Sequence, residues 1–235
     1  MIRNKKALLA ATLPFLLAEI ILGVLLQVSS GRASEIIEYS AIILACLFCV
    51  LFAERSLSYI FTQCALIFTV FADYFLVYSE EMQQLPAMLF FSVTQICYFL
   101  RLYFEDNDEN RRKRHIICRI SLSLAIIVIT AAVLGKNCDA LALVSMFYYA
   151  NLILNAIFAC IEFKKNPIFA TGLILFILCD TVIGLSMIDS YLPLSPDAFI
   201  YKIIHPGFNL AWVFYLPSQT LLSISLLPKR LKCQQ

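Results

Sequence analysis

The chain has 235 residues, of which 61% are hydrophobic and 14% are charged, and its formal net charge is +2. Soluble domains contain about a quarter charged residues and somewhat less than half apolar residues, so this composition excludes an ordinary water-soluble enzyme and a disordered chain. The small net charge, with one basic run flanked by acids, also excludes a nucleic-acid-binding protein.

Eight stretches of the chain are apolar and long enough to cross a bilayer, whose hydrocarbon core of about 30 Å needs about 20 residues in a helix. In chain order they are residues 8–28, 37–53, 57–78, 85–104, 116–135, 140–161, 167–188 and 207–227. Helices are expected, because unpaired backbone groups are costly in lipid and no period-two barrel pattern is present. We therefore predict an all-α integral membrane protein of eight transmembrane helices, forming a single polytopic domain over residues 1–235.

Lysine and arginine are distributed unevenly between alternate connectors, and an excess of these residues marks the cytoplasmic side of membrane proteins. The side of the N-terminus holds or adjoins Arg3, Lys5, Lys6, Arg55, Arg101, Arg111, Arg112, Lys113, Arg114, Arg119, Lys164, Lys165, Lys229, Arg230 and Lys232. The other side holds Arg32, Lys136 and Lys202. Both termini are therefore predicted to be cytoplasmic, in a multi-pass protein of a cell membrane, and a bacterial plasma membrane fits.

The longest charged segment lies between the fourth and fifth apolar stretches. Residues 105–114 read Glu-Asp-Asn-Asp-Glu-Asn-Arg-Arg-Lys-Arg, and we expect them to form a solvated loop. Its basic end anchors the topology, and an alternative role is to bind anionic lipid headgroups at the membrane surface.

The chain has nine cysteines, and seven of them fall inside apolar runs, where a free cysteine behaves as a small hydrophobic residue. The two histidines are His115, expected on the cytoplasmic side, and His205, at the outer entry to the eighth stretch. Metal-dependent membrane hydrolases need several histidine ligands close to their acids. We therefore expect no metal site and no cofactor.

The third and seventh apolar stretches resemble each other. In each, a single aspartate follows a long run of mostly apolar residues. Asp73 lies in Leu-Ile-Phe-Thr-Val-Phe-Ala-Asp-Tyr-Phe-Leu, and Asp180 lies in Leu-Ile-Leu-Phe-Ile-Leu-Cys-Asp-Thr-Val-Ile. The stretch that follows each aspartate contains a glutamine, Gln95 or Gln219. Because four helices separate the matching segments, the pattern is that of two parallel four-helix repeats.

These polar residues fall at similar depths in the membrane. At a rise of 1.5 Å per residue, Asp73 lies roughly 8 Å and Asp180 roughly 12 Å below the outer boundary, and Gln95, Gln219 and Asn151 lie between the midplane and that boundary. A carboxylate there costs about 3 kcal/mol on insertion scales, so it is expected to face a cavity or a partner. The set predicts one polar pocket open toward the outer leaflet, while interhelical hydrogen bonding explains the amides equally well.

Five short motifs occur in order along residues 57–227. Ala-Asp-Tyr-Phe-Leu at 72–76, Thr-Gln-Ile-Cys-Tyr at 94–98 and Phe-Tyr-Tyr-Ala-Asn at 147–151 are followed by Leu-Phe-Ile-Leu-Cys-Asp at 175–180 and Phe-Tyr-Leu-Pro-Ser-Gln at 214–219. They resemble the Gly-Asp-x-x-Leu, Ala-His-x-x-Tyr, tyrosine-containing, Leu-Phe-x-x-Ser-Asp and Tyr-Tyr-x-x-Gln segments of the YhhN family. This is a family of small eight-span membrane proteins that includes lysoplasmalogenases.

The resemblance implies hydrolysis of the vinyl-ether bond of a lysoplasmalogen, which releases a fatty aldehyde and a glycerophospho-headgroup. Protonation of the alkene carbon gives an oxocarbenium ion that water captures. This chemistry needs one protonated carboxyl and one carboxylate, a division of labour that glycosidases also use. In this hypothesis the catalytic pair is Asp73 and Asp180, and the lysophospholipid substrate is bound by Gln95, Tyr98, Tyr148, Asn151, Tyr215 and Gln219.

The chain departs from the family pattern in the fourth stretch, where Gln95 replaces a histidine, and glutamine does not shuttle protons near neutral pH. An alternative is therefore a small-molecule or lipid transporter, or a lipid-binding membrane protein, without hydrolytic activity. A third is a scaffold in which Asp73 and Asp180 have no chemical role. The expected partners are the lipid bilayer and its lipids, and no sequence feature indicates an oligomeric state.

Overall fold

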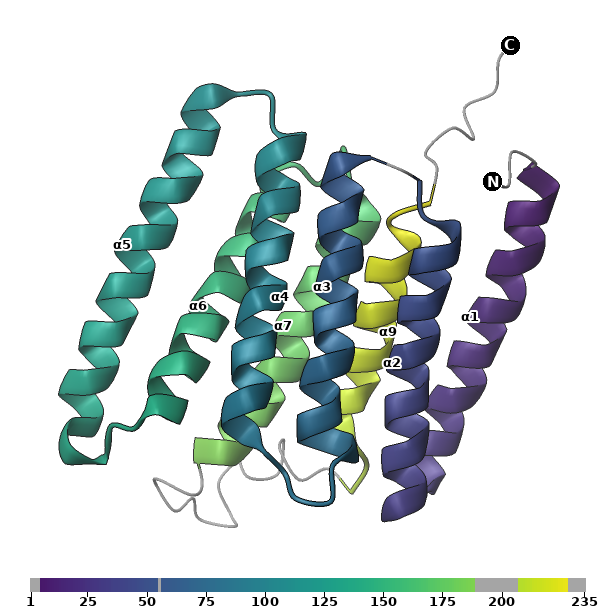
Figure 1. The fold of residues 1–235 in the computed structure, drawn as a ribbon, viewed down its shortest axis with the longest axis horizontal. Helices are drawn as coiled ribbons and strands as arrows, with labels where there is room; N and C mark the ends of the chain where they lie inside the picture. The colour runs from purple at the N-terminus through teal and green to yellow at the C-terminus, as the bar shows by residue number, and fades with distance from the viewer. Residues whose placement is uncertain (1–4, 55, 189–206, 228–235) are drawn as a thin grey trace.

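The computed structural model describes residues 5–54, 56–188 and 207–227, and all regular secondary structure in these ranges is helical (Figure 1). Seven helices are long and apolar enough to cross a membrane, and an eighth is shorter, which confirms the predicted all-α membrane fold. The elements are α1 Lys5–Val28, α2 Arg32–Phe52, α3 Leu57–Asp73, η1 Tyr74–Tyr78, α4 Gln84–Glu105, α5 Glu109–Leu134, η2 Gly135–Asn137, α6 Ala140–Ile161, α7 Pro167–Ile188 and α9 Leu210–Ile224.

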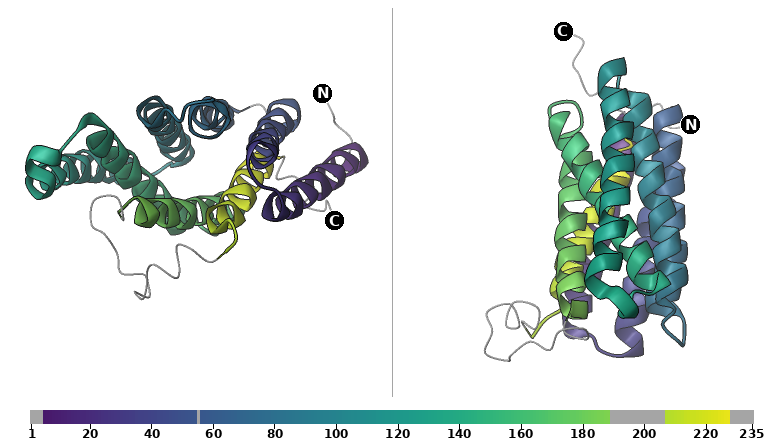
Figure 2. Two further views of the ribbon diagram at one scale, coloured as in Figure 1. Left: turned by 90° about the horizontal axis from the view of Figure 1, so that it is seen from below. Right: turned by 90° about the vertical axis from the view of Figure 1, so that its left-hand side faces the viewer.

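The helices are arranged in two layers (Figure 2). One layer contains α3 and α4, and the other contains α6, α7 and α9, while α2 packs against both α3 and α9. The outermost helices are α5 at one edge, which packs mainly on α6, and α1 at the other, which packs on α2 and α9. Only 11% of the most apolar segment of α1, and the same share in α5, is buried, so their apolar side chains face outward as in lipid-facing helices.

The two predicted halves of the chain have comparable positions in the bundle. The first helix of each half, α1 or α5, lies at an edge. The third and fourth helices of each half form a closely packed pair, α3 with α4 and α7 with α9, and the two pairs lie in opposite layers (Figure 2). This arrangement is compatible with a parallel repeat, and it places the two aspartate-bearing helices, α3 and α7, in facing layers.

The N-terminal end of α1 and the C-terminal end of α9 lie at the same end of the bundle (Figure 1). This is expected when a chain crosses the membrane an even number of times. The first turns of α5, with residues 111–114, lie at this end too, and we call it the basic end. That the basic end is cytoplasmic stays a prediction. The connector over residues 189–206 and His205 within it lie outside the described residues.

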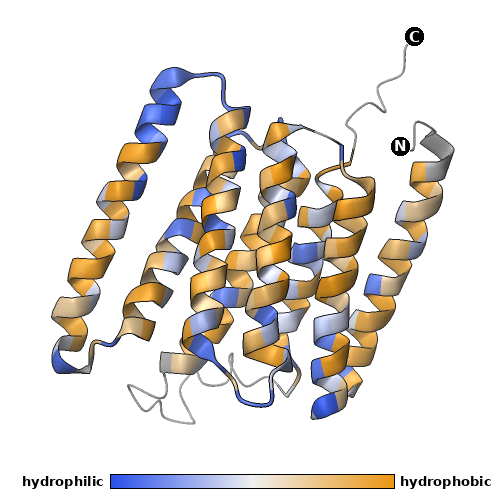
Figure 3. Ribbon diagram, viewed as in Figure 1, coloured by the Kyte–Doolittle hydropathy of each residue, from blue (hydrophilic) through white to orange (hydrophobic). Residues whose placement is uncertain are grey.

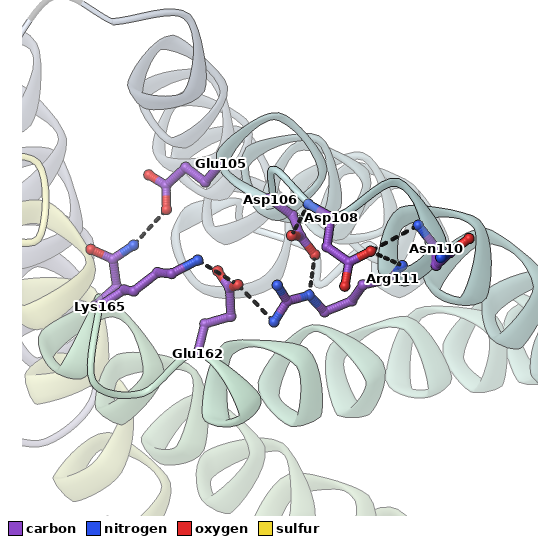
Figure 4. Close-up of polar contacts among 8 residues, drawn as sticks. Glu105, Asp106, Asp108, Asn110, Arg111, Glu162 and Lys165 are labelled. Carbon is purple, nitrogen blue, oxygen red and sulfur yellow. Dashed lines mark hydrogen bonds and ion pairs between the residues drawn. The ribbon is translucent and has the colours of Figure 1, made fainter.

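The predicted loop over residues 105–114 is wrong, because α5 begins at Glu109 and only residues 106–108 are non-helical. Figure 3 shows hydrophilic residues continuing into the first turns of α5. Asp108 caps the helix, since its carboxylate accepts hydrogen bonds from the backbone N–H groups of Asn110 at 2.9 Å and Arg111 at 3.3 Å. Arg111 then forms ion pairs with Asp106 and Glu162 (Figure 4). The other predicted spans agree with the helices within five residues at each boundary.

α7 and α9 approach each other closely at Gly172. A Cβ atom at this position would lie 2.9 Å from Cγ and 3.3 Å from the backbone nitrogen of Leu222. Ser218 Oγ donates a hydrogen bond to the Gly172 carbonyl at 2.8 Å. Small residues allow membrane helices to pack without a hydrophobic driving force between them. This contact holds α9, which carries Tyr215, directly against α7, which carries Asp180.

We expect Gly172→Val to destabilise the fold by about 1–3 kcal/mol, because the new side chain overpacks the α7–α9 contact. Gly184→Val is the matched control in the same helix, since a Cβ there meets nothing within 4 Å. Thermal unfolding of the two variants in detergent measures the difference. Equal unfolding midpoints would show that α7 and α9 do not depend on this close approach.

Candidate functional site

Asp73 is the last residue of α3 and directly precedes η1, which is a π-helical segment. The backbone N–H of Ser79 donates to the carbonyl of Tyr74 at 2.8 Å, the i→i+5 bond that defines such a turn. Short π segments within helices occur frequently at functional sites. The Asp73 residue is only 1% exposed, and its carboxyl accepts a hydrogen bond from the Tyr215 hydroxyl of α9 at 2.7 Å.

Asp180 lies within α7 and is held in a similar way. Its carboxyl accepts a hydrogen bond from the hydroxyl of Tyr148 on α6. The neighbouring residues fix the same interface, because the Tyr149 hydroxyl and Thr181 Oγ1 lie 2.8 Å apart. Thr181 also donates to the Ile177 carbonyl of its own helix at 2.7 Å. Each aspartate is therefore oriented by a tyrosine from another helix.

Aromatic rings connect the two aspartate–tyrosine pairs. The Phe176 ring lies 5.5 Å from Tyr215 and 6.2 Å from Phe91, between ring centroids, and Phe91 lies 5.6 Å from Tyr148. Asp180 is also close enough to Asp73 for their charges to interact. The structure thus brings four of the predicted site residues into one region, with apolar rings between them. These four are Asp73, Asp180, Tyr148 and Tyr215. Their chemical roles stay a prediction.

A third carboxyl belongs to the same region and was missed in the sequence. Glu38 on α2 is 8% exposed and lies within electrostatic range of Asp73. Its carboxyl accepts hydrogen bonds from Ser34 Oγ at 3.3 Å and Asn209 Nδ2 at 3.2 Å. Glu38 stands at the start of the second apolar stretch, where an acid is ordinarily exposed at the membrane surface. Its proximity to Asp73 becomes apparent only when the packing of α2 against α3 is known.

The predicted residues Gln95 and Asn151 belong to a different group, which links α4, α5 and α6. Asn155 Nδ2 donates to the backbone carbonyl of Gln95 at 2.9 Å and to its Oε1 at 3.0 Å. Arg119 donates to Oδ1 of Asn155 at 2.6 Å and to Oδ1 of Asn151. These amides therefore make the interhelical hydrogen bonds that their alternative interpretation predicted, and a part in substrate binding stays a prediction.

His115 is buried and Arg119 is partly buried against α6, although both lie in the half of α5 nearer the basic end. His115 is 4% exposed, and its ring stacks on Phe158 with centroids 3.6 Å apart. Its Nε2 lies 3.2 Å from Nη2 of Arg119. That His115 lies on the cytoplasmic side stays a prediction. Because α5 starts early, both residues lie one helical turn apart on its α6-facing side, a relation that hydropathy does not show.

The last two predicted residues, Tyr98 and Gln219, are buried among other helices. The Tyr98 ring packs edge-on against Phe169, with centroids 5.7 Å apart. Within the described part of the chain, the Tyr98 hydroxyl and both side-chain polar atoms of Gln219 have no hydrogen-bond partner. Buried polar groups are normally paired with protein or water. Neither residue lines the cavities described below, and their part in substrate binding stays a prediction.

Two cavities among the described residues have their lining resolved here, and neither is lined by Asp73 or Asp180. One of about 260 Å³ lies near the basic end and is lined by Glu54, Ser56, Ser58, Tyr59, Glu105, Lys165 and Asn166. The other, of about 370 Å³, lies between α4 and α5. No group of three or more His, Cys, Asp or Glu residues suited to a metal ion occurs in the described ranges.

Comparison with known proteins gives one match. A sequence model of the YhhN family matches residues 34–226, which covers α2 to α9 and every residue of the two polar groups. No curated protein and no solved structure matches the chain. The first helix, α1, lies outside the matched segment.

We expect Asn155→Leu to destabilise the protein by about 1–3 kcal/mol or more, because it leaves the buried guanidinium of Arg119 short of an acceptor. The matched control is Asn110→Leu at the exposed start of α5, where the side chain makes no hydrogen bond within the described structure. Thermal unfolding in detergent compares the two. A loss of stability in Asn110→Leu as large as in Asn155→Leu would contradict a special role of the network.

Proposed function

We propose a function from the premise that this chain belongs to the YhhN family, a family of lysoplasmalogenase-like membrane proteins. The proposed activity is hydrolysis of the vinyl-ether bond of lysoplasmalogens within the membrane. The observation that carries the proposal is the pair of membrane-embedded aspartates, Asp73 and Asp180, each held by a tyrosine hydroxyl in one region of the bundle. Such residues are costly inside a membrane, and they are typically functional.

Vinyl-ether hydrolysis suits a pair of carboxyl groups. A protonated carboxyl transfers its proton to the alkene carbon, and the oxocarbenium ion that results is stabilised by a neighbouring carboxylate. The carboxylate then takes a proton from the attacking water, and the hemiacetal collapses to an aldehyde and a free hydroxyl. Water is the only co-reactant, and each carboxyl returns to its starting state when the two exchange the proton.

The local contacts support distinct tasks for the surrounding residues. Tyr215 and Tyr148 each occupy one side of an aspartate, which orients the carboxyl and leaves its other oxygen for substrate or water. The rings of Phe91, Phe176 and Trp212 line the same region, with Trp212 5.0 Å from Tyr215, and they suit an aliphatic chain. Glu38 places a further acid near Asp73, so three carboxyl groups share a region in which full ionisation is costly.

A lipid-binding or transporting protein without hydrolytic activity is the second candidate. The observation that favours it is Gln95, which stands where the family motif has a histidine. Its side-chain oxygen accepts a hydrogen bond from Asn155 and is part of the network that joins α4, α5 and α6. In that case the same polar region would hold a lipid headgroup and no aldehyde would form.

We expect Asp73→Asn and Asp180→Asn each to lower aldehyde release from lysoplasmalogen by about 10²-fold or more, because each removes a group that transfers a proton. Purified protein in detergent or vesicles is assayed for aldehyde. Glu81→Gln is the matched control, since this acid is exposed in the short connector that follows η1.

Unfolding midpoints of the parent and the variants establish that each protein is folded. Aldehyde release by the parent and by Glu81→Gln, but not by the two aspartate variants, supports the hydrolase. Full activity in either folded aspartate variant contradicts the pair mechanism. A folded parent that binds lysoplasmalogen and releases no aldehyde supports the second candidate instead.

A further inference from the structure

The cavity between α4 and α5 is a groove with an apolar wall. It is lined by Phe99, Leu100, Tyr103 and Phe104 from α4 and by Ile116, Arg119 and Ile120 from α5, and its volume is about 370 Å³. This volume lies within the range of small-molecule sites. Both helices are of membrane-spanning length, and the lining residues lie in the half of each helix nearer the basic end. In a bilayer such a surface faces acyl chains.

Two cations contact aromatic rings of this groove: Arg119 lines it, and Arg112 lies over the ring of Tyr103, which lines it. The guanidinium of Arg112 lies 5.3 Å from the ring centroid of Tyr103, in the first turn of α5. The guanidinium of Arg119 lies 4.4 Å from the ring centroid of Phe99, deeper in the helix. Neither arginine pairs with a carboxylate in the described part of the chain, and no acidic residue lines the groove. The groove therefore combines an apolar wall with uncompensated positive charge.

The acids of the neighbouring connector are already committed to other partners. Glu105 lies 3.4 Å from Nε of Arg101 and accepts a hydrogen bond from Asn166 (Figure 4). Asp106 pairs with Arg111 at 2.6 Å, and Glu109 pairs with Lys113 at 2.8 Å. Asp108 caps α5 through backbone N–H groups. Because these acids are already paired, Arg112 at the mouth of the groove has no carboxylate partner in the described structure.

We propose that this groove binds an anionic phospholipid from the leaflet at the basic end, with its phosphate at Arg112 and an acyl chain along the wall between α4 and α5. The site is separate from the region of Asp73 and Asp180 and does not depend on the proposed hydrolysis. Arg119 is held in place by Asn151 and Asn155, so it contributes fixed positive charge at the deep end. Basic residues at a membrane surface attract anionic lipids, and the apolar wall adds hydrophobic contact along the chain.

Native mass spectrometry of the full-length protein tests this site. Protein freed of lipid in a neutral detergent is mixed with phosphatidylglycerol or phosphatidylcholine that carry identical oleoyl chains. We expect at least fivefold more retained phosphatidylglycerol than phosphatidylcholine in the parent. Arg112→Gln should abolish this preference, and Arg112→Lys, which keeps the charge, should retain it. Arg114→Gln is the matched control, since it removes the same charge from an exposed position of α5 that, in the described structure, has no cation–π contact with a groove residue.

A second variant tests the apolar wall, because Ile120→Trp fills the groove without changing the charge. It should lower retention of both lipids by at least threefold. Equal retention of the two lipids by the parent overturns the proposal, as does an equal loss in Arg112→Gln and Arg114→Gln. Displacement of phosphatidylglycerol by an equimolar amount of glycerol 3-phosphate also overturns it, since the site would then bind a phosphate rather than a lipid. Unfolding midpoints confirm that each variant is folded.

Discussion

A carboxyl group inside a helical bundle in lipid needs a partner from the protein, and the positions of Asp73 and Asp180 depend on this requirement. Tyr215 joins α9 to α3 through Asp73, and Tyr148 joins α6 to α7 through Asp180. The close contact at Gly172 joins α7 to α9. Four helices from both layers are thus connected through one polar region. The same bonds that satisfy the acids also hold the helices that form the candidate site.

In the edge helix α5, the positively charged side chain of Arg119 likewise needs hydrogen-bond partners from the protein. Few of its residues are buried, so apolar packing contributes little to its attachment. Instead Arg119 reaches into the bundle and bonds to two asparagines of α6, one of which bonds in turn to α4. Hydrogen bonds between membrane helices stabilise such contacts, because lipid offers these groups no alternative partner. The polar network therefore defines where α5 packs.

Hydropathy predicted the helices well because backbone in lipid has few alternatives to a helix. It also indicated Asp73 and Asp180, since an isolated acid in an apolar run stands out. Hydropathy did not predict the start of α5, because its value falls where the charged residues begin. The helix nevertheless continues through these residues, since Asp108 caps it and Glu109 pairs with Lys113. Partners such as Glu38 and Arg119 were not predictable, because a single sequence does not show which helix faces meet. The π turn after Asp73 has no signal in the amino-acid composition.

That π turn changes the angular phase of the third span. Each residue of an α-helix advances by about 100°, so the additional residue in the wide turn rotates the last residues of the span relative to the helix before Asp73. Tyr78, the last residue of the turn, stacks on Tyr39 with ring centroids 4.8 Å apart, and the Arg32 guanidinium lies 4.5 Å from the Tyr78 ring centroid. One helix can therefore direct an acid toward the interior and, a turn later, an aromatic ring toward α2. The last five residues of the span therefore meet their neighbours under a different geometric constraint from the α-helical residues before them.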